Sequence, residues 1–223
     1  MDWQALWLSL LLGLCTAAVL VPAGIPAARA IAWGRFPGRS IVQAVVALPL
    51  ILPPTVLGYY LLTLLGSRSP IGRGYEALFH EPLVFSFQGI LLASLIFNIP
   101  FVLQPMQRAF EGIPRSLREA AWCSGLSDWR TFLRVELPLA WPGVLAAIIL
   151  TVAHTLGEFG VVLMVGGNIE AETRTVSIAI YDRVQAFDDR GAGLMSAVLL
   201  VLSFASITTI YALNERFGRG RIW

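Results

Sequence analysis

Residues Arg115 to Pro142 read R-S-L-R-E-A-A-W-C-S-G-L-S-D-W-R-T-F-L-R-V-E-L-P-L-A-W-P and form the longest charge-rich block in an otherwise apolar chain. Apolar runs long enough to cross a bilayer lie on both sides of this block. Its tryptophans and arginines are the residue types favoured at the centres of protein interfaces. They are also typical of an amphipathic helix on a lipid surface, with its tryptophans among the headgroups. The composition of the block therefore leaves two interpretations open, a docking element or a membrane-surface helix.

The composition of the whole chain is that of an integral membrane protein. Of its 223 residues, 57% are hydrophobic and only 13% are charged, and the mean hydropathy is +0.72. Such values exclude an ordinary soluble domain. The net charge of +2 fits the arginines that membrane proteins collect on their cytoplasmic loops. We expect no nucleic-acid partner, because no basic patch alternates with aromatic residues outside the apolar runs.

Five segments are long and apolar enough to span a membrane as helices, which requires about 20 residues each. They cover residues 3–28, 41–65, 84–106, 137–167 and 192–213. The first segment has no basic region before it and is too long for a signal peptide, so we expect it to be retained as a span. The sequence thus predicts a single all-α transmembrane domain over residues 1–223, with a loop over residues 108–136 between the third and fourth spans.

Prolines and polar residues interrupt two of these spans. Pro49, Pro53 and Pro54 remove backbone donors from the second span and should kink or break it. Two interpretations of this break stay open, a static kink and a pore-lining bend. Asn98 and Gln104 in the third span would be costly if they faced lipid, so we expect them to face other helices or a cavity.

The distribution of arginines predicts the orientation of the chain. Arginines without nearby acids follow the first span, and five more lie between the third and fourth spans. The loops after the second and fourth spans are balanced or acidic instead. By the positive-inside rule the N-terminus lies outside, and the tail with Arg216, Arg219 and Arg221 lies in the cytoplasm. An odd number of spans agrees with this distribution.

The sequence contains no pattern typical of a nucleotide, metal or covalent cofactor site. It has no G-x-x-x-x-G-K-[ST] loop and no lysine with which to build one, so nucleotide energy would have to come from another chain. His80 and His154 lack the spacing of a zinc site. Cys15 and Cys123 are poorly placed for a disulfide. We therefore expect a non-catalytic chain without cofactor or metal.

Within the charged block, residues 116–126 favour a short helix. Ser116 can cap its start, with Glu119 three positions later as the partner in a capping box, and Gly125 can end it. A surface of small side chains, which lets another backbone come close, comprises Ala120, Ala121, Ser124 and Gly125. Apolar anchors on the other side of the helix are Leu117, Trp122 and Leu126.

The spacing of this block resembles the E-A-A-x3-G-x9-I-x-L-P signature of bacterial ABC importer permeases. The matching residues are Glu119, Ala120, Ala121, Gly125, Leu137 and Pro138, with Val135 in place of the usual Ile. The resemblance implies a coupling helix that sits in a cleft of a cytoplasmic ABC ATPase subunit and carries its nucleotide-driven closure to the spans. It further implies a permease homodimer in the bacterial inner membrane, two ATPase subunits, and a periplasmic or lipid-tethered binding protein.

A second resemblance covers most of the chain from Leu48 onward. Residues 156–160 read L-G-E-F-G and residues 167–181 read G-N-I-E-A-E-T-R-T-V-S-I-A-I-Y, and both stretches are similar to segments of the molybdate permease family. Sulfate and thiosulfate permeases have a related G-E-[YF]-G segment. The resemblance implies import of molybdate, with sulfate, thiosulfate or tungstate as alternative cargoes. A membrane scaffold without an ATPase partner is the rival interpretation from another class.

The fourth span and the loop after it carry a candidate pathway or gate set, which comprises Gly157, Glu158, Gly160, Asn168 and Arg174. Glu158 stands four residues after His154, on the same face of a helix. A carboxylate lining the path would repel an oxyanion, so we favour a structural role in which Glu158 accepts hydrogen bonds, for example from Arg174. A gate role and direct cargo contact are the alternatives. Arg174 suits an oxyanion site, but an ordinary turn followed by a surface helix over residues 176–187 is the favoured interpretation.

Overall fold

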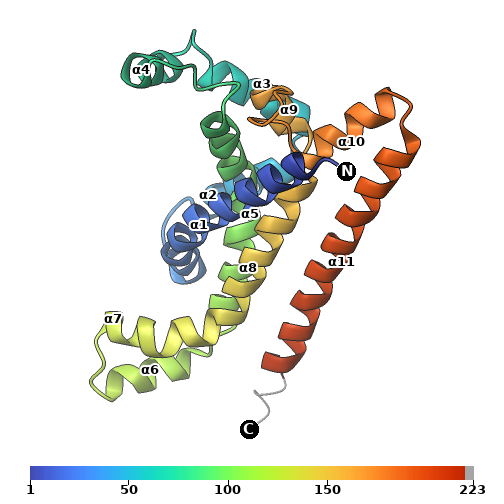
Figure 1. Ribbon diagram of the computed structural model, residues 1–223. Helices are drawn as coiled ribbons and strands as arrows, with labels where there is room; N and C mark the ends of the chain where they lie inside the picture. The colour runs from blue at the N-terminus through green and yellow to red at the C-terminus, as the bar shows by residue number, and fades with distance from the viewer. Residues whose placement is uncertain (219–223) are drawn as a thin grey trace.

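The computed structural model describes residues 1–218, and within this range the chain forms helices and no strands (Figure 1). The helices are α1 (Trp3–Trp33), α2 (Arg39–Ile51), α3 (Pro54–Leu65), α4 (Pro70–Phe79), α5 (Phe87–Glu111), α6 (Arg115–Cys123), α7 (Asp128–Thr131), α8 (Leu137–Gly157), α9 (Gly160–Gly166), α10 (Val176–Gln185) and α11 (Asp189–Gly218). A π-helical turn, Phe132–Glu136, joins α7 to α8. The predicted all-α class is confirmed.

Four helical stretches among residues 1–218 are long and apolar enough to cross a membrane: α1, α5, the continuous helix Asp128–Gly157, and α11. A fifth span exists if α2 and α3, which are bent by 108° relative to each other, count as one broken span. The break falls at Leu52 and Pro53, and Pro54 starts α3. The prolines of this segment therefore break the helix as predicted, because they cannot donate backbone hydrogen bonds.

Several helix boundaries differ from the predicted ones. α1 continues through Pro22 and Pro26 to Trp33, past its predicted end. Prolines are tolerated in membrane helices when neighbouring groups satisfy the freed carbonyls. The predicted loop over residues 108–136 is mostly helical, because α5 extends to Glu111, α6 follows, and the helix that becomes α8 already starts at Asp128.

The predicted fourth span, residues 137–167, is not one helix. α8 ends at Gly157 and α9 begins at Gly160. Glu158 has an extended backbone (φ −68°, ψ 128°), and its side chain accepts the N–H of Val161 at 2.9 Å. The carboxylate thus replaces the carbonyl that a continuous helix would offer to this N–H. Glu158 ends one helix and caps the next.

The core of the chain lies where α1, α5 and α8 pack together. Phe110 and Met106 of α5 belong to one buried cluster with Val144 of α8. Gly143 lets α5 and α8 cross closely, because a Cβ at this position would collide with the side chain of Ala109. Small residues serve this purpose at crossings of membrane helices. α1 therefore packs against other helices of the same chain.

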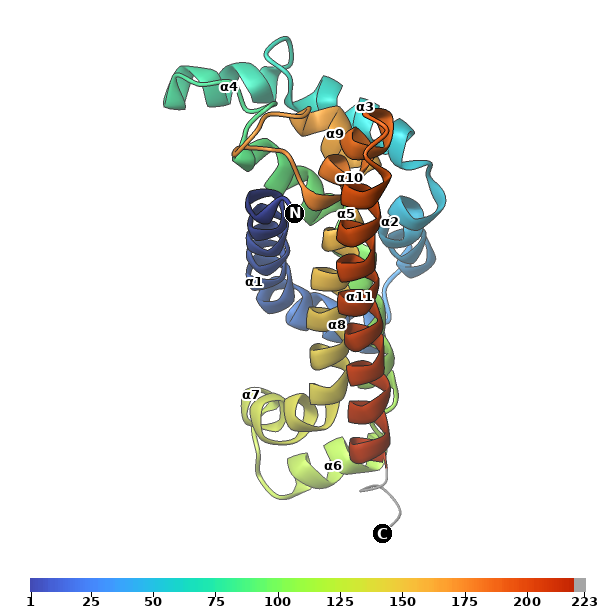
Figure 2. The ribbon, with the colours of Figure 1, turned by 45° about the vertical axis from the view of Figure 1, so that its right-hand side comes forward.

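The two ends of the molecule carry different elements. α6, α7 and the C-terminal end of α11 lie at one end, whereas α4, α9 and α10 lie toward the other (Figures 1 and 2). α11 runs beside α8 with most of its apolar surface uncovered, and Phe204 is 72% exposed. Such a surface suits lipid or another protein. The predicted tail residues Arg219 and Arg221 lie outside the described residues.

Candidate functional site

The predicted docking helix is α6, which starts one residue earlier than expected. It begins at Arg115 after Pro114, whose backbone (φ −58°, ψ 136°) precedes the helix without a side-chain cap. The predicted capping box of Ser116 and Glu119 is therefore wrong, because Ser116 lies inside the first turn. Proline fixes its own φ at a value that suits this position, so the helix needs no hydroxyl cap.

Gly125 ends α6, as its position predicts. Its φ is +79°, in the left-handed region. The N–H of Gly125 donates to the carbonyl of Trp122 at 2.9 Å, and the N–H of Leu126 donates to the carbonyl of Ala121 at 3.1 Å. This pair of bonds is a Schellman motif, which favours glycine at the left-handed residue.

The residues of the E-A-A signature lie on the outside of α6, with one exception. Glu119, Ala120 and Gly125 are exposed, whereas Ala121 is buried. At the start of α8, Pro138 is exposed and Leu137 is half-buried. Exposed large apolar side chains nearby in the sequence are Leu117, Trp122 and Trp129. This end of the molecule therefore presents small and large apolar side chains together, which suits a protein partner.

A buried ion-pair cluster lies beside α6, and the sequence did not predict it. The Glu136 side chain has no exposed surface, and its two carboxylate oxygens accept from Arg29 of α1 at 2.6 Å and from Arg118 of α6 at 2.9 Å. We call Arg29, Arg118 and Glu136 the Glu136 cluster. Its signal in the sequence is weak, because an acid at the edge of an apolar run does not identify its partners.

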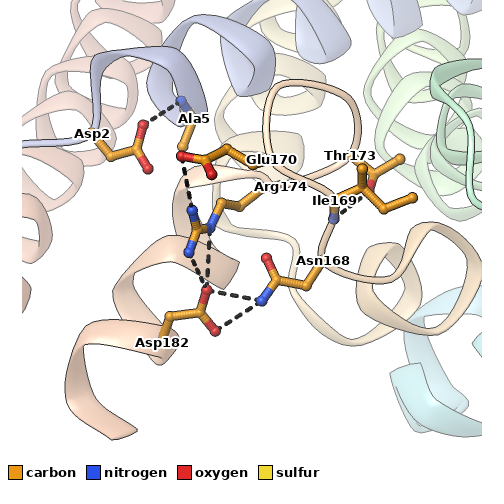
Figure 3. A network of polar contacts seen from close by, with 8 residues as sticks. All are labelled: Asp2, Ala5, Asn168, Ile169, Glu170, Thr173, Arg174 and Asp182. Carbon is orange, nitrogen blue, oxygen red and sulfur yellow. Dashed lines mark hydrogen bonds and ion pairs between the residues drawn. The ribbon is translucent and has the colours of Figure 1, made fainter. Parts of the chain in front are cut away.

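Two of the predicted pathway residues, Asn168 and Arg174, share Asp182 of α10 as a partner (Figure 3). Asn168 Nδ2 donates to Asp182 Oδ2 at 2.9 Å, and Arg174 donates to the same oxygen at 2.8 Å. Glu170 lies 3.5 Å from the Arg174 guanidinium. The hydrogen bond to Asp182 raises the pKa of Arg174 above its usual range. The predicted pairing of Arg174 with Glu158 is therefore wrong, because Asp182 and Glu170 hold the guanidinium.

The surroundings of Arg174 are acidic, which argues against an oxyanion site. A cavity of about 340 Å³ has charged lining residues Asp2, Glu170, Asp182, Asp188, Arg174 and Arg183. Its carboxylates outnumber its guanidiniums, so it would repel an anion. Thr173 donates to the Gly166 carbonyl at 2.7 Å, and α10 begins at Val176. The interpretation as an ordinary turn followed by a helix is supported. Within residues 1–218, no group of three or more His, Cys, Asp or Glu side chains is placed to hold a metal ion.

The remaining predicted pathway residues lie where the two interrupted helices touch. Gly160 at the start of α9 packs against Pro54 at the start of α3, and a Cβ on Gly160 would lie 2.7 Å from Pro54 Cβ. Gly157 is exposed, with open space where its Cβ would be. Irregular backbone inside a membrane protein needs protein contacts or a wet cavity around it. Here the break after Gly157 is packed against the break before Pro54.

Asn98 faces the interior, as predicted, and joins α5 to α8. Its Nδ2 donates to Thr155 Oγ1 at 3.1 Å and to the Ser94 carbonyl at 2.9 Å, and its Oδ1 lies 3.1 Å from His154 Nδ1. These contacts satisfy an amide with no exposed surface. His154 belongs to this network. The prediction that His154 and Glu158 share a helical face is wrong, because Glu158 lies beyond the end of α8.

The capping role of Glu158 leads to a stability prediction. Glu158→Gln keeps an oxygen that can accept the Val161 N–H, so the stability of the chain should stay near that of the wild type. Glu158→Ala removes the acceptor and should lower the free energy of unfolding by about 0.5–2 kcal/mol, the usual contribution of a helix cap. Thermal unfolding in detergent measures both variants. Wild-type stability of Glu158→Ala would contradict the cap.

Known proteins resemble this chain in sequence. Residues 21–219 match the family described as binding-protein-dependent transport system inner membrane component. The chain is 43% identical over 219 residues to the molybdenum transport system permease protein ModB of Azotobacter vinelandii. The aligned region covers 98% of this chain and 96% of ModB. It is 35% identical to the sulfate transport system permease protein CysT of Escherichia coli (strain K12), over 83% of this chain and 66% of CysT.

A solved structure shares the fold. A bacterial ABC transporter involved in the import of the acidic polysaccharide alginate matches 97% of this chain and 78% of its own, with a TM-score of 0.70 and 18% identity. At this identity the likeness concerns the fold alone. The family match covers most of the sequence, and the match to ModB extends nearly from end to end. The chain therefore belongs to the family of inner membrane components of binding-protein-dependent transport systems.

Proposed function

We propose that this chain is the permease subunit of an ATP-driven ABC importer that carries molybdate into the cytoplasm. The observation that carries the proposal is α6, a helix that bears the E-A-A signature, ends at Gly125 and presents Glu119 and Ala120 on its surface. Identity to ModB over nearly the whole chain supports molybdate as the cargo. The residues that couple to the ATPase are Glu119, Ala120, Ala121, Gly125, Leu137 and Pro138.

The chain works as a homodimer in the bacterial inner membrane, with two cytoplasmic ABC ATPase subunits that bind and hydrolyse the nucleotide. A periplasmic or lipid-tethered oxyanion-binding protein delivers the cargo. ATP-driven closure brings the two α6 helices together and opens the pathway outward, and hydrolysis resets it inward. α6 lies at the same end as the C-terminal end of α11 (Figure 1). The arginines around α6 support a cytoplasmic location for that end and an outside location for the N-terminus.

The gate region of this proposal is the contact between the two helix breaks, around Gly157, Glu158 and Gly160. Glu158 holds the break by capping α9 and does not contact cargo, because a carboxylate would repel an oxyanion. Asn168 and Arg174 hold the loop after α9 through Asp182 and are likewise not cargo ligands. Selection of the cargo falls mainly to the binding protein.

Sulfate or thiosulfate import is the second candidate, and the identity to CysT favours it. Tungstate is a further alternative, because it is a tetrahedral dianion like molybdate. The match to CysT covers less of both chains than the match to ModB does, which ranks molybdate first. A membrane scaffold without an ATPase does not account for the exposed coupling surface.

Uptake by a bacterial strain that lacks its own molybdate permease tests the proposal. With this chain and its ATPase restored, uptake of radioactive molybdate should return, and unlabelled molybdate should compete more strongly than sulfate. An ATPase subunit should co-purify with the tagged chain. Stronger competition by sulfate would identify sulfate as the cargo in place of molybdate. Failure of the chain to co-purify with any ATPase would overturn its assignment to an ABC importer.

A further inference from the structure

The Glu136 cluster joins three elements that take part in the proposed motion. Arg118 belongs to α6, Arg29 belongs to α1, and Glu136 lies in the π-helical turn that leads into α8. The carboxylate accepts from Arg29 Nε at 2.6 Å and from Arg118 Nε at 2.9 Å. One side chain thus connects the docking helix directly to two membrane helices.

Burial makes these bonds difficult to replace. The Glu136 side chain is fully buried, and the Arg118 side chain is only 16% exposed. A buried carboxylate that loses a partner is left as a charge without compensation, which destabilises a protein far more than a broken surface pair does. α6 therefore cannot move away from α1 easily, and we expect the two helices to move together.

Aromatic contacts strengthen the same connection. The Arg118 guanidinium lies 3.7 Å from the ring centre of Trp33, the last residue of α1, and 5.0 Å from that of Trp122 in α6. A guanidinium over an indole ring is attracted to it electrostatically. Trp33 therefore holds Arg118 from the α1 side, in addition to the shared carboxylate.

We propose that Glu136 is a positioning residue for transport, which ties α6 to α1 and α8 so that a push on α6 reaches both membrane helices as one body. The inference rests on the proposed function, because it requires that α6 receives the motion of the ATPase. Glu136 acts through the two arginines and touches neither the ATPase nor the cargo. Its loss should therefore change how ATP hydrolysis is converted into transport, and should leave the docking surface of α6 intact.

The ion pair between Arg39 and Glu111 provides a matched control. It joins the start of α2 to the end of α5 at 2.9 Å, and its two side chains are 37% and 38% exposed. Neither residue belongs to α6, and exposed pairs contribute little to stability. Glu111→Gln therefore removes the same charge as Glu136→Gln without cutting the connection between α6 and α1.

Glu136→Gln is expected to uncouple the transporter. Three quantities are measured: co-purification of the ATPase subunits with the tagged chain, ATP hydrolysis by the purified complex, and uptake of radioactive molybdate by cells. Co-purification and hydrolysis should persist. Uptake per ATP hydrolysed should fall at least about fivefold, the lower end of energetic coupling between distant sites. Glu111→Gln should behave like the wild type.

Arg118→Gln is the second variant, because it cuts α6 from the cluster while Glu136 keeps its bond to Arg29. It should show the same uncoupling even if Glu136→Gln fails to assemble. If either variant assembles and has wild-type uptake per ATP hydrolysed, the proposed positioning role of Glu136 is overturned. If both variants fail to assemble, that role is overturned in favour of a purely structural one. A wild-type complex that takes up none of molybdate, tungstate and sulfate overturns the proposed function itself, a result that the variants cannot produce.

Discussion

Gly125→Trp is expected to leave the chain in the membrane and to abolish both ATPase co-purification and molybdate uptake. No atom lies within 4 Å of the position that a Cβ on Gly125 would occupy. The indole therefore projects away from the chain, into the space where the proposed ATPase cleft receives α6. The substitution creates no collision within the chain, but the left-handed backbone at φ +79° costs tryptophan about 1–2 kcal/mol, as it costs any L residue with a Cβ. Membrane levels of the variant should therefore match those of Gly125→Ala, which has the same backbone strain.

Two smaller substitutions at Gly125 separate the bulk of the side chain from the strain of the backbone. Asparagine adopts the left-handed conformation more readily than most residues, so Gly125→Asn should keep the end of α6 and most of the uptake. Gly125→Ala adds a left-handed penalty of about 1–2 kcal/mol with little bulk, so it should lower stability more than it impairs docking. Wild-type co-purification and uptake in Gly125→Trp would show that this surface does not contact the ATPase.

The end of α6 and the broken second span could be predicted from the sequence because their causes are local. Gly125 ends α6 through its own backbone preference, and Pro53 and Pro54 break the second span because they lack N–H donors. The lengths of the apolar runs predict spans, since the thickness of the bilayer fixes the length of a spanning helix. None of these inferences requires knowledge of a distant partner.

The Glu136 cluster and the break at Glu158 could not be predicted, for two different reasons. Arg29, one partner of Glu136, lies 107 residues earlier in the chain, so only the packing of α1 against α8 brings the charges together. Glu158 accepts a hydrogen bond from the N–H of Val161, just three residues later, so the cause of this break is local in the sequence. The apolar residues on both sides of Glu158 hide that cause, because they have the pattern of a continuous span.

Gly160→Leu is expected to disrupt the subunit where the two helix breaks touch, and to abolish uptake. A Cβ on Gly160 would lie 2.7 Å from Pro54 Cβ and 3.7 Å from Pro54 Cα. The proline ring has no rotamer that could move it aside, so α3 and α9 must separate. Overpacking of this kind costs about 1–3 kcal/mol. Thermal unfolding in detergent and molybdate uptake measure the two effects.

Gly157→Leu is the matched control, because it makes the same substitution on the other side of the same break. No atom lies within 4 Å of a Cβ at Gly157, so thermal stability should stay near that of the wild type. Equal stability of the two variants would contradict the close packing of the breaks. Loss of uptake in a stable Gly157→Leu chain would place the open space beside Gly157 in the translocation path or at a contact with a partner, since a side chain that destabilises nothing can stop transport only by blocking one of these.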